Sequence, residues 1–131
     1  MAWTYEQATG RLIDPTGTEV ATGYAGGNCG QNPEGKNNPA LQDKHGIGPL
    51  PQGTYTFDQV ENSPHLGPFA IILEPDPANE MFGRSSFRIH GDSINNPGAA
   101  SEGCMIFPRA VRELVWASGD HTISVVSGEQ S

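Results

Sequence analysis

The chain has 131 residues, a hydrophobic fraction of 35% and a net charge of −8, which together fit a single folded domain. The acidic balance argues against a nucleic-acid partner, since nucleic acids are bound through clustered Lys and Arg. No window approaches the ~20 apolar residues of a membrane helix, so we expect no membrane insertion. The two cysteines and four isolated histidines lack zinc-site spacing, and we expect neither a metal nor another cofactor.

The predicted elements, in chain order, form a mostly β domain with one short helix. Seventeen glycines and eleven prolines provide many turns, for which short strands are the natural partner. We expect strands at residues 3–7, 11–13, 18–22, 53–57, 69–73, 86–90 and 121–126. No repeat or low-complexity tail divides the chain, so residues 1–131 are predicted to form one domain.

Two further segments interrupt this series of strands. Residues 23–48 form a long polar loop rich in Gly and Asn, and loops of that length in a compact domain are usually functional or mobile. The one clear helix is expected between Pro108 and Gly119, where apolar residues recur at helical spacing.

The segment RIHGDSINNPGAASEGCMIF, residues 88–107, holds the residues most suited to chemistry. His90 ends a strand and projects opposite the two apolar side chains of that strand. A nearby imidazole would raise the thiolate fraction of Cys104 and later protonate a leaving amine. Gly103 allows close backbone approach, so main-chain N–H groups near the cysteine could face a developing oxyanion.

Structural interpretations of the same residues stay open at this point. A lone cysteine beside Met-Ile-Phe is most often a small buried hydrophobe, and a lone histidine at a strand end is most often a hydrogen-bonded structural residue. A disulfide between Cys29 and Cys104 is a third interpretation, which requires an oxidising compartment.

Three segments in order carry a likeness: GPLPQGTY at 48–55, GRSSFRIHG at 83–91 and SEGC at 101–104. They resemble the Pro-x-Gly-x-Tyr/Phe, Ile-His-Gly and Ser/Thr-x-Gly-Cys motifs of the L,D-transpeptidase superfamily of peptidoglycan enzymes. The chain is most similar to the type VI secretion effectors of that superfamily, which attack the wall of rival bacteria. The resemblance implies an L,D-transpeptidase-like β sandwich or barrel, with a short helix after the catalytic cysteine.

The resemblance also implies acyl transfer on a peptidoglycan stem peptide. Cys104 would attack the carbonyl at the L-centre of the diamino acid and expel the terminal D-alanine. The thioester would pass to water, as in an L,D-carboxypeptidase, or to an amine such as a free D-amino acid, as in exchange. His90 would act as general base and then general acid. The Ser101 carbonyl would orient the imidazole, and the N–H groups of Gly103 and Cys104 would form the oxyanion hole.

Two positions depart from the pattern of typical cell-wall transpeptidases. Glu102 stands where they have histidine, and Ile106 stands where they usually have arginine. Arg109 is the first candidate to bind a substrate carboxylate, with Arg84 second; a solvated arginine is the alternative for Arg109. Asp92 is close enough in sequence to tune the pKa of His90 or to bind a substrate amine. The alternative is a turn-forming residue after Gly91.

Two other functions compete with this interpretation. One is a peptidoglycan amidase or endopeptidase of another Cys-His class, and the other is a non-catalytic wall-binding module. An activated Cys104 should be alkylated faster than Cys29, whereas a structural one should not.

The expected place of action follows from the N-terminus and the resemblance together. MAWTYEQATG has neither the basic start nor the apolar core of a signal peptide, so we expect synthesis in the bacterial cytoplasm without one. Action would follow secretion into the periplasm of a target cell. The expected partners are stem peptides, the secretion machinery and a periplasmic immunity protein that plugs the cleft between residues 23–48 and Cys104.

Overall fold

One continuous β-sheet organises the chain in the computed structural model, which describes residues 2–64 and 66–128. Within these ranges the strand order is β3-β2-β1-β9-β5-β6-β7-β8-β4. The strands are β1 (Trp3–Glu6), β2 (Arg11–Ile13), β3 (Glu19–Thr22), β4 (Tyr24–Ala25), β5 (Gly53–Ser63), β6 (Gly67–Pro75), β7 (Arg88–His90), β8 (Met105–Ile106) and β9 (Thr122–Val126). The helices are the 3₁₀ turns η1 (Asn28–Gly30), η2 (Pro33–Gly35) and η3 (Pro39–Leu41), and the α-helix α1 (Arg109–Ala117).

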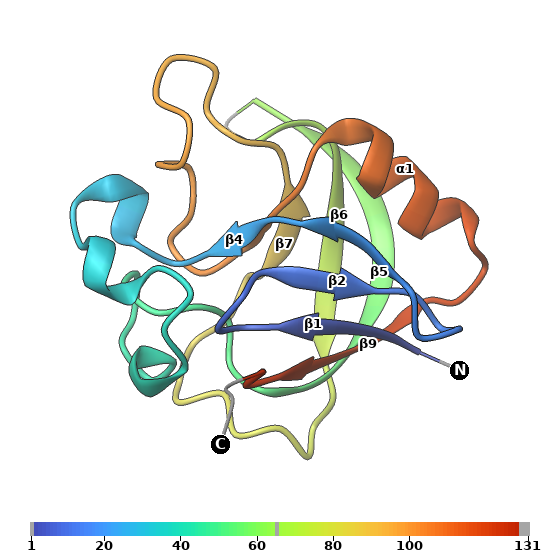
Figure 1. Cartoon of the computed structure of the whole chain (residues 1–131), viewed down its shortest axis with the longest axis horizontal. Helices are drawn as coiled ribbons and strands as arrows, with labels where there is room; N and C mark the ends of the chain where they lie inside the picture. Colours follow the sequence, from blue (N-terminus) through green and yellow to red (C-terminus); the bar gives the residue numbers. More distant parts are fainter. Residues whose placement is uncertain (1, 65, 129–131) are drawn as a thin grey trace.

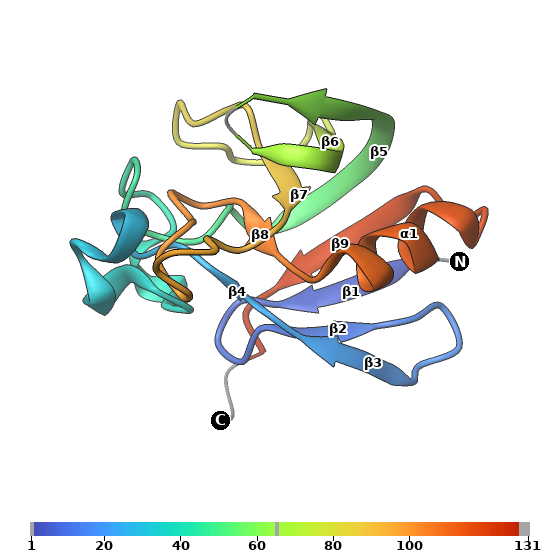
Figure 2. The ribbon, with the colours of Figure 1, turned by 90° about the horizontal axis from the view of Figure 1, so that it is seen from above.

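The sheet turns back on itself along β5, so that its two halves face each other (Figure 1). The first residues of β5, Gly53–Thr56, pair with β9, and β5 also pairs with β6 across a register shift between Phe57 and Val60. Such irregularities increase local twist and bend a strand. Figure 2 shows the result, with β1, β2, β3 and β9 in one layer and β6 and β7 in the other.

Aromatic and aliphatic side chains fill the space between the layers. The rings of Tyr5 and Phe107 meet edge to face, with centroids 6.0 Å apart. Helix α1 packs its buried Val115 against this core, and the indole N–H of Trp3 donates to Ser118 Oγ at 3.1 Å just beyond the helix. The core thus ties the first strand to the helix that follows the candidate nucleophile.

The prediction of a mostly β chain with one short helix after Cys104 is confirmed. The helix begins one residue after Pro108, which is its N-cap. β5 and β6 extend beyond the predicted 53–57 and 69–73, because they continue as a partly exposed hairpin without clean apolar alternation. The strand predicted at 86–90 begins at Arg88, since Ser86 has a φ of 67° that breaks the extended backbone.

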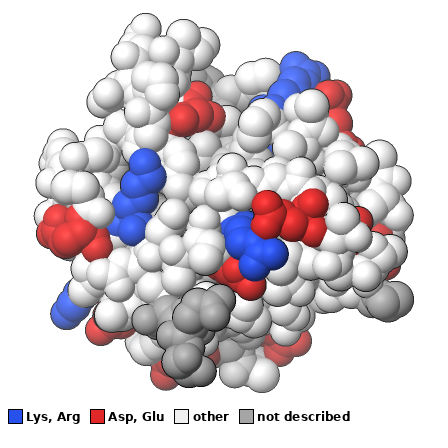
Figure 3. All heavy atoms as spheres, in the orientation of Figure 1, with Lys and Arg blue, Asp and Glu red and all other residues white. Residues whose placement is uncertain are grey.

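The remaining sequence-based expectations concern the surface and the extent of the domain. The structure contains no helix, within the described residues, that is long and apolar enough to cross a bilayer. On the face seen in Figure 3, basic side chains are few and separated from one another. The assignment of 1–131 to one domain stays a prediction, and residues 1, 65 and 129–131 lie outside the described part.

Candidate active site

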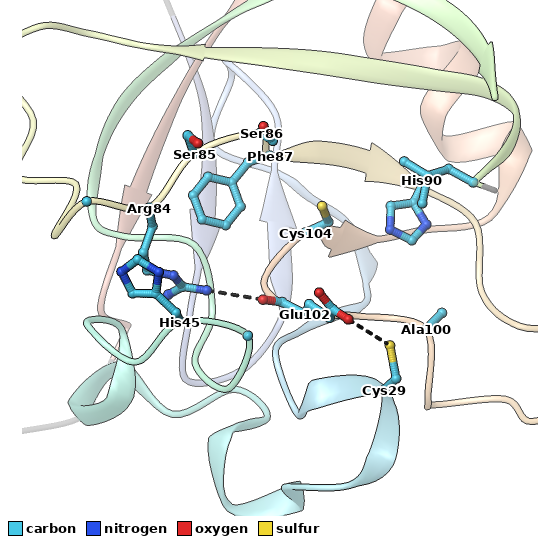
Figure 4. A pocket seen from close by; sticks show the side chains of 13 residues that line it. Cys29, His45, Arg84, Ser85, Ser86, Phe87, His90, Ala100, Glu102 and Cys104 are labelled. Carbon is cyan, nitrogen blue, oxygen red and sulfur yellow. Dashed lines mark hydrogen bonds between the residues drawn. The ribbon is translucent and has the colours of Figure 1, made fainter.

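His90 and Cys104 are brought together by two neighbouring parallel strands. In the ladder between β7 and β8, Ile89 is paired with Met105 and His90 with Ile106. Cys104 directly precedes β8 and lies two residues before Ile106, the partner of His90. Paired residues share one face of a sheet, and so do residues two apart on one strand. Both side chains therefore lie on the same face of the sheet, and both line one cleft of about 580 Å³ (Figure 4).

The walls of this cleft come from four stretches of the chain. They are the long loop at residues 23–48, the β5–β6 hairpin, the segment leading into β7, and residues 100–104, which form the nucleophile segment. The lining residues are Cys29, His45, Gly46, Leu66, Gly83, Arg84, Ser85, Ser86, Phe87, His90, Ala100, Glu102 and Cys104.

The Cys104 thiol is protonated at neutral pH. Burial raises the pKa of this thiol to about 11, and the nearby Glu102 carboxylate acts in the same direction. The backbone N–H of Arg88 donates to Sγ at 3.3 Å and opposes this rise, because it favours the thiolate. A base must therefore remove the proton before or during attack on a carbonyl.

His90 has the protonation state of such a base. Burial lowers the pKa of His90, and the positive charge of the buried Arg112 lowers it further. A hydrogen bond to Gly91 raises the pKa but does not outweigh these two effects. The ring Nδ1 lies 2.9 Å from the Gly91 carbonyl oxygen, which can only accept. Nδ1 therefore carries the hydrogen, and Nε2 presents a lone pair.

Ser101 holds the nucleophile segment through its hydroxyl. This fully buried hydroxyl donates to the Cys104 carbonyl at 2.6 Å and accepts the N–H groups of Gly26 and Gly103 at 2.8 and 3.0 Å. Two expectations are therefore not met in this conformation. The Ser101 carbonyl accepts the Cys29 N–H rather than the imidazole, and the Gly103 N–H is already engaged.

Arg84 lines the cleft but directs its guanidinium at the protein's own backbone. Its NH1 and NH2 groups donate to the carbonyls of Gln42, Pro49, Gly48 and Glu102 at 2.6, 2.7, 3.0 and 3.1 Å. Burial lowers the pKa of this guanidinium, although arginine stays charged in proteins. These contacts favour a clamp on the cleft wall over a ligand for substrate carboxylate.

Arg109 and Asp92 lie outside the set of cleft-lining residues. Arg109 is on the exposed side of α1, where its Nε is 3.8 Å from Glu113. Asp92 accepts the Tyr24 hydroxyl at 2.5 Å and the N–H groups of Ser93 and Gly98. Partial burial would raise the pKa of Asp92, but these hydrogen bonds hold it below its usual value. This geometry is that of the turn-forming alternative.

Two titratable cleft residues come from the long loop and were assigned no catalytic or binding role from the sequence. His45 lines the cleft and joins it to the segment before β7, with Nε2 2.9 Å from the Phe82 carbonyl. Cys29 faces the cleft from η1, and both cysteines are free thiols. The length of the 23–48 loop indicated a function, but no local pattern identified these two positions within it.

The structure also offers no metal-binding group: among the described residues, no three His, Cys, Asp or Glu side chains cluster in a way that could hold an ion.

Comparison with known proteins supports the effector branch of the resemblance. A family model described as the Tlde1 domain matches residues 22–127, which include every cleft-lining residue. Searches of curated proteins and of solved structures found no match.

Arg84→Lys should lower the free energy of unfolding by about 1–3 kcal/mol. The compact ammonium cannot reproduce the planar fork, so at least one buried carbonyl loses its donor. Urea denaturation measures the change. Arg11→Lys is the matched control, because the Arg11 side chain is 41% exposed and its ion-pair partners are the carboxylates of Glu6 and the 44% exposed Glu19. Equal stabilities of the two variants would contradict the clamp.

Alkylation of Cys104 should rise about tenfold per pH unit between pH 7 and 10. The thiolate is the reactive form, and a pKa of about 11 keeps it scarce throughout this range. The measurement is the iodoacetamide rate in Cys29→Ser protein. Exposed Cys29, followed in Cys104→Ala protein, should react faster at pH 7, because Cys104 is buried and protonated in the free protein. The order of the two alkylation rates therefore does not separate an activated Cys104 from a structural one. A rate for Cys104 that levels off below pH 9 would refute the assignment.

Proposed function

The chain belongs to the Tlde1 domain family, and from this premise we propose that it is a peptidoglycan-targeting cysteine acyltransferase. It acts on stem peptides as an L,D-carboxypeptidase, as an L,D-transpeptidase that exchanges D-amino acids, or as both. The observation that carries the proposal is the placement of His90 and Cys104 on one face of two paired strands, in one cleft.

The acylation half-reaction uses the protonation states of this pair. His90 Nε2 takes the proton of the Cys104 thiol as sulfur attacks the carbonyl at the L-centre of the diamino acid. The tetrahedral intermediate collapses with cleavage of the amide bond. The imidazolium gives its proton to the departing amine of D-alanine, and a thioester remains on Cys104.

The second half-reaction releases the acyl group. Water attacks the thioester to give the tripeptide acid, or a D-amino acid attacks through its amine to give an exchanged tetrapeptide. His90 accepts the nucleophile's proton and returns one to the sulfur, which restores the thiol and the neutral imidazole. An oxyanion forms twice, and the Cys104 N–H is its proposed donor, joined by the Gly103 N–H once that group leaves the Ser101 hydroxyl.

The same proposal includes the place of action. A type VI effector is delivered by the secretion machinery, and its wall substrate lies in the periplasm of the target cell. A producing strain then needs a periplasmic immunity protein. The cleft between Cys29 and His45 of the long loop and Cys104 is the surface that such a partner would block.

Cys104→Ala should abolish product formation from purified muropeptides, because all covalent chemistry is assigned to one sulfur. His90→Ala should reduce the rate by roughly 10²–10⁴, the usual contribution of a positioned proton-transfer group. Mass spectrometry of the products measures both and separates hydrolysis from exchange. Cys29→Ser is the control and should keep most activity. Product formation by Cys104→Ala would reject the mechanism.

Toxicity should depend on the compartment in which the protein is made. Fusion to a periplasmic signal should stop growth and swell or lyse the cells, since tetrapeptide donors for cross-linking are lost, while cytoplasmic expression should be harmless. The measurement is growth of paired cultures expressing wild type and Cys104→Ala in each compartment. Equal periplasmic toxicity of the two proteins would mean that the damage is not enzymatic.

A further inference from the structure

Glu102 presents the one carboxylate among the described residues that line the cleft. Its backbone is fixed, because its carbonyl accepts from Arg84 at 3.1 Å and its neighbours Ser101 and Gly103 are buried. Figure 4 shows the carboxylate in the space between the two cysteines, with Oε1 3.9 Å from Cys29 Sγ. The side chain thus projects into the cleft from a rigid base.

Among residues 2–64 and 66–128, no basic side chain forms an ion pair with this carboxylate. In the ranges 2–64 and 66–128, the ion pairs engage Glu6, Glu19, Glu61 and Glu113, and none engages Glu102. The two arginines whose charges act on the Cys104 thiol have other partners. Arg84 donates to four carbonyls, and Arg88 is paired with Glu61 at 2.7 Å.

An unpaired carboxylate in this place opposes the chemistry of the free enzyme. Negative charge disfavours a nearby thiolate, and Glu102 adds to the effect of burial in raising the pKa of both Cys104 and Cys29. A cation brought by the substrate would neutralise the carboxylate at the moment when a thiolate is needed. The cleft is therefore complementary to a positively charged group.

We propose that Glu102 is a specificity-determining residue that binds an ammonium group of the substrate beside Cys104. A carboxylate and an ammonium form a charge-assisted hydrogen bond, which is stronger than a neutral one. The inference rests on the proposed function, whose stem peptide offers two sources of this group. One is the side-chain amine of the diamino acid in the donor, and the other is the amine of a D-amino acid acceptor.

The test compares wild type with Glu102→Gln in two assays. The first is hydrolysis, without an acceptor, of a tetrapeptide whose side-chain amine is free and of the same peptide with that amine acetylated. The second is exchange of a D-amino acid into the acetylated tetrapeptide. Glu113→Gln is the matched control, because it changes net charge equally from the exposed side of α1, outside the cleft.

Glu102→Gln should raise the KM by roughly tenfold for the free-amine donor, and leave the KM for the acetylated donor unchanged, if the donor supplies the ammonium. An acceptor source is recognised instead by a roughly tenfold rise in the KM for the D-amino acid, with hydrolysis unaffected. Either result supports the subsite, and Glu113→Gln should show neither. KM values that Glu102→Gln leaves unchanged in both assays would overturn the subsite alone. Absence of turnover by wild type on every stem peptide would overturn the proposed function, and the subsite with it.

Discussion

The cleft depends on one buried guanidinium. Arg84 is 6% exposed, and its four hydrogen bonds reach carbonyls that lie 35 to 42 residues before it and 18 residues after it. Gly103 makes this contact sterically feasible, since a Cβ there would lie 2.6 Å from the guanidinium and its φ is +141°. A buried charge is tolerated only where hydrogen bonds replace its lost hydration. Arg84 therefore needs the carbonyls at the end of the long loop as hydrogen-bond partners, and that part of the chain is held in place by Arg84.

Ser101 also joins separate backbone segments, through the hydrogen bonds of its hydroxyl. Its hydroxyl is one donor and a double acceptor, so it fixes the backbone at Gly26, Gly103 and Cys104 together. With Arg84 it leaves the nucleophile segment little freedom. The reactive groups themselves are held more simply, by strand pairing and by the bond from His90 to Gly91. Rigid surroundings of this kind keep catalytic groups in a productive geometry.

The sequence predicted the pieces that depend on local pattern. The apolar stripe before Gly119 indicated α1, and the Ile-His-Gly and Ser-x-Gly-Cys motifs indicated the pair that the strands place in one cleft. The role of Arg84 was missed because its partners are backbone carbonyls, which every residue type offers and no pattern marks. For the same reason the sequence did not indicate that Ser101 would act through its hydroxyl, which bonds to backbone groups, and not through its carbonyl.

Asp92 illustrates a different difficulty. An aspartate two residues after a histidine is equally suited to tuning that histidine and to closing a turn. The structure gives its carboxylate two local donors, the N–H groups of Ser93 and Gly98, which close the turn. The hydroxyl of Tyr24 in β4, 68 residues earlier in the chain, also donates to it. The contact with Tyr24 depends on the assembled sheet, so the spacing of neighbouring residues could not predict it.

The burial of Cys104 also affects how the protein withstands oxidants. Peroxide and disulfides react with the thiolate, and a thiol whose pKa is about 11 holds roughly one part in ten thousand in that form at neutral pH. The sulfur of the proposed nucleophile is thus held as a thiol, its least oxidisable state, in the free protein. Exposed Cys29, on the facing wall of the cleft, is the thiol that an oxidising environment reaches first.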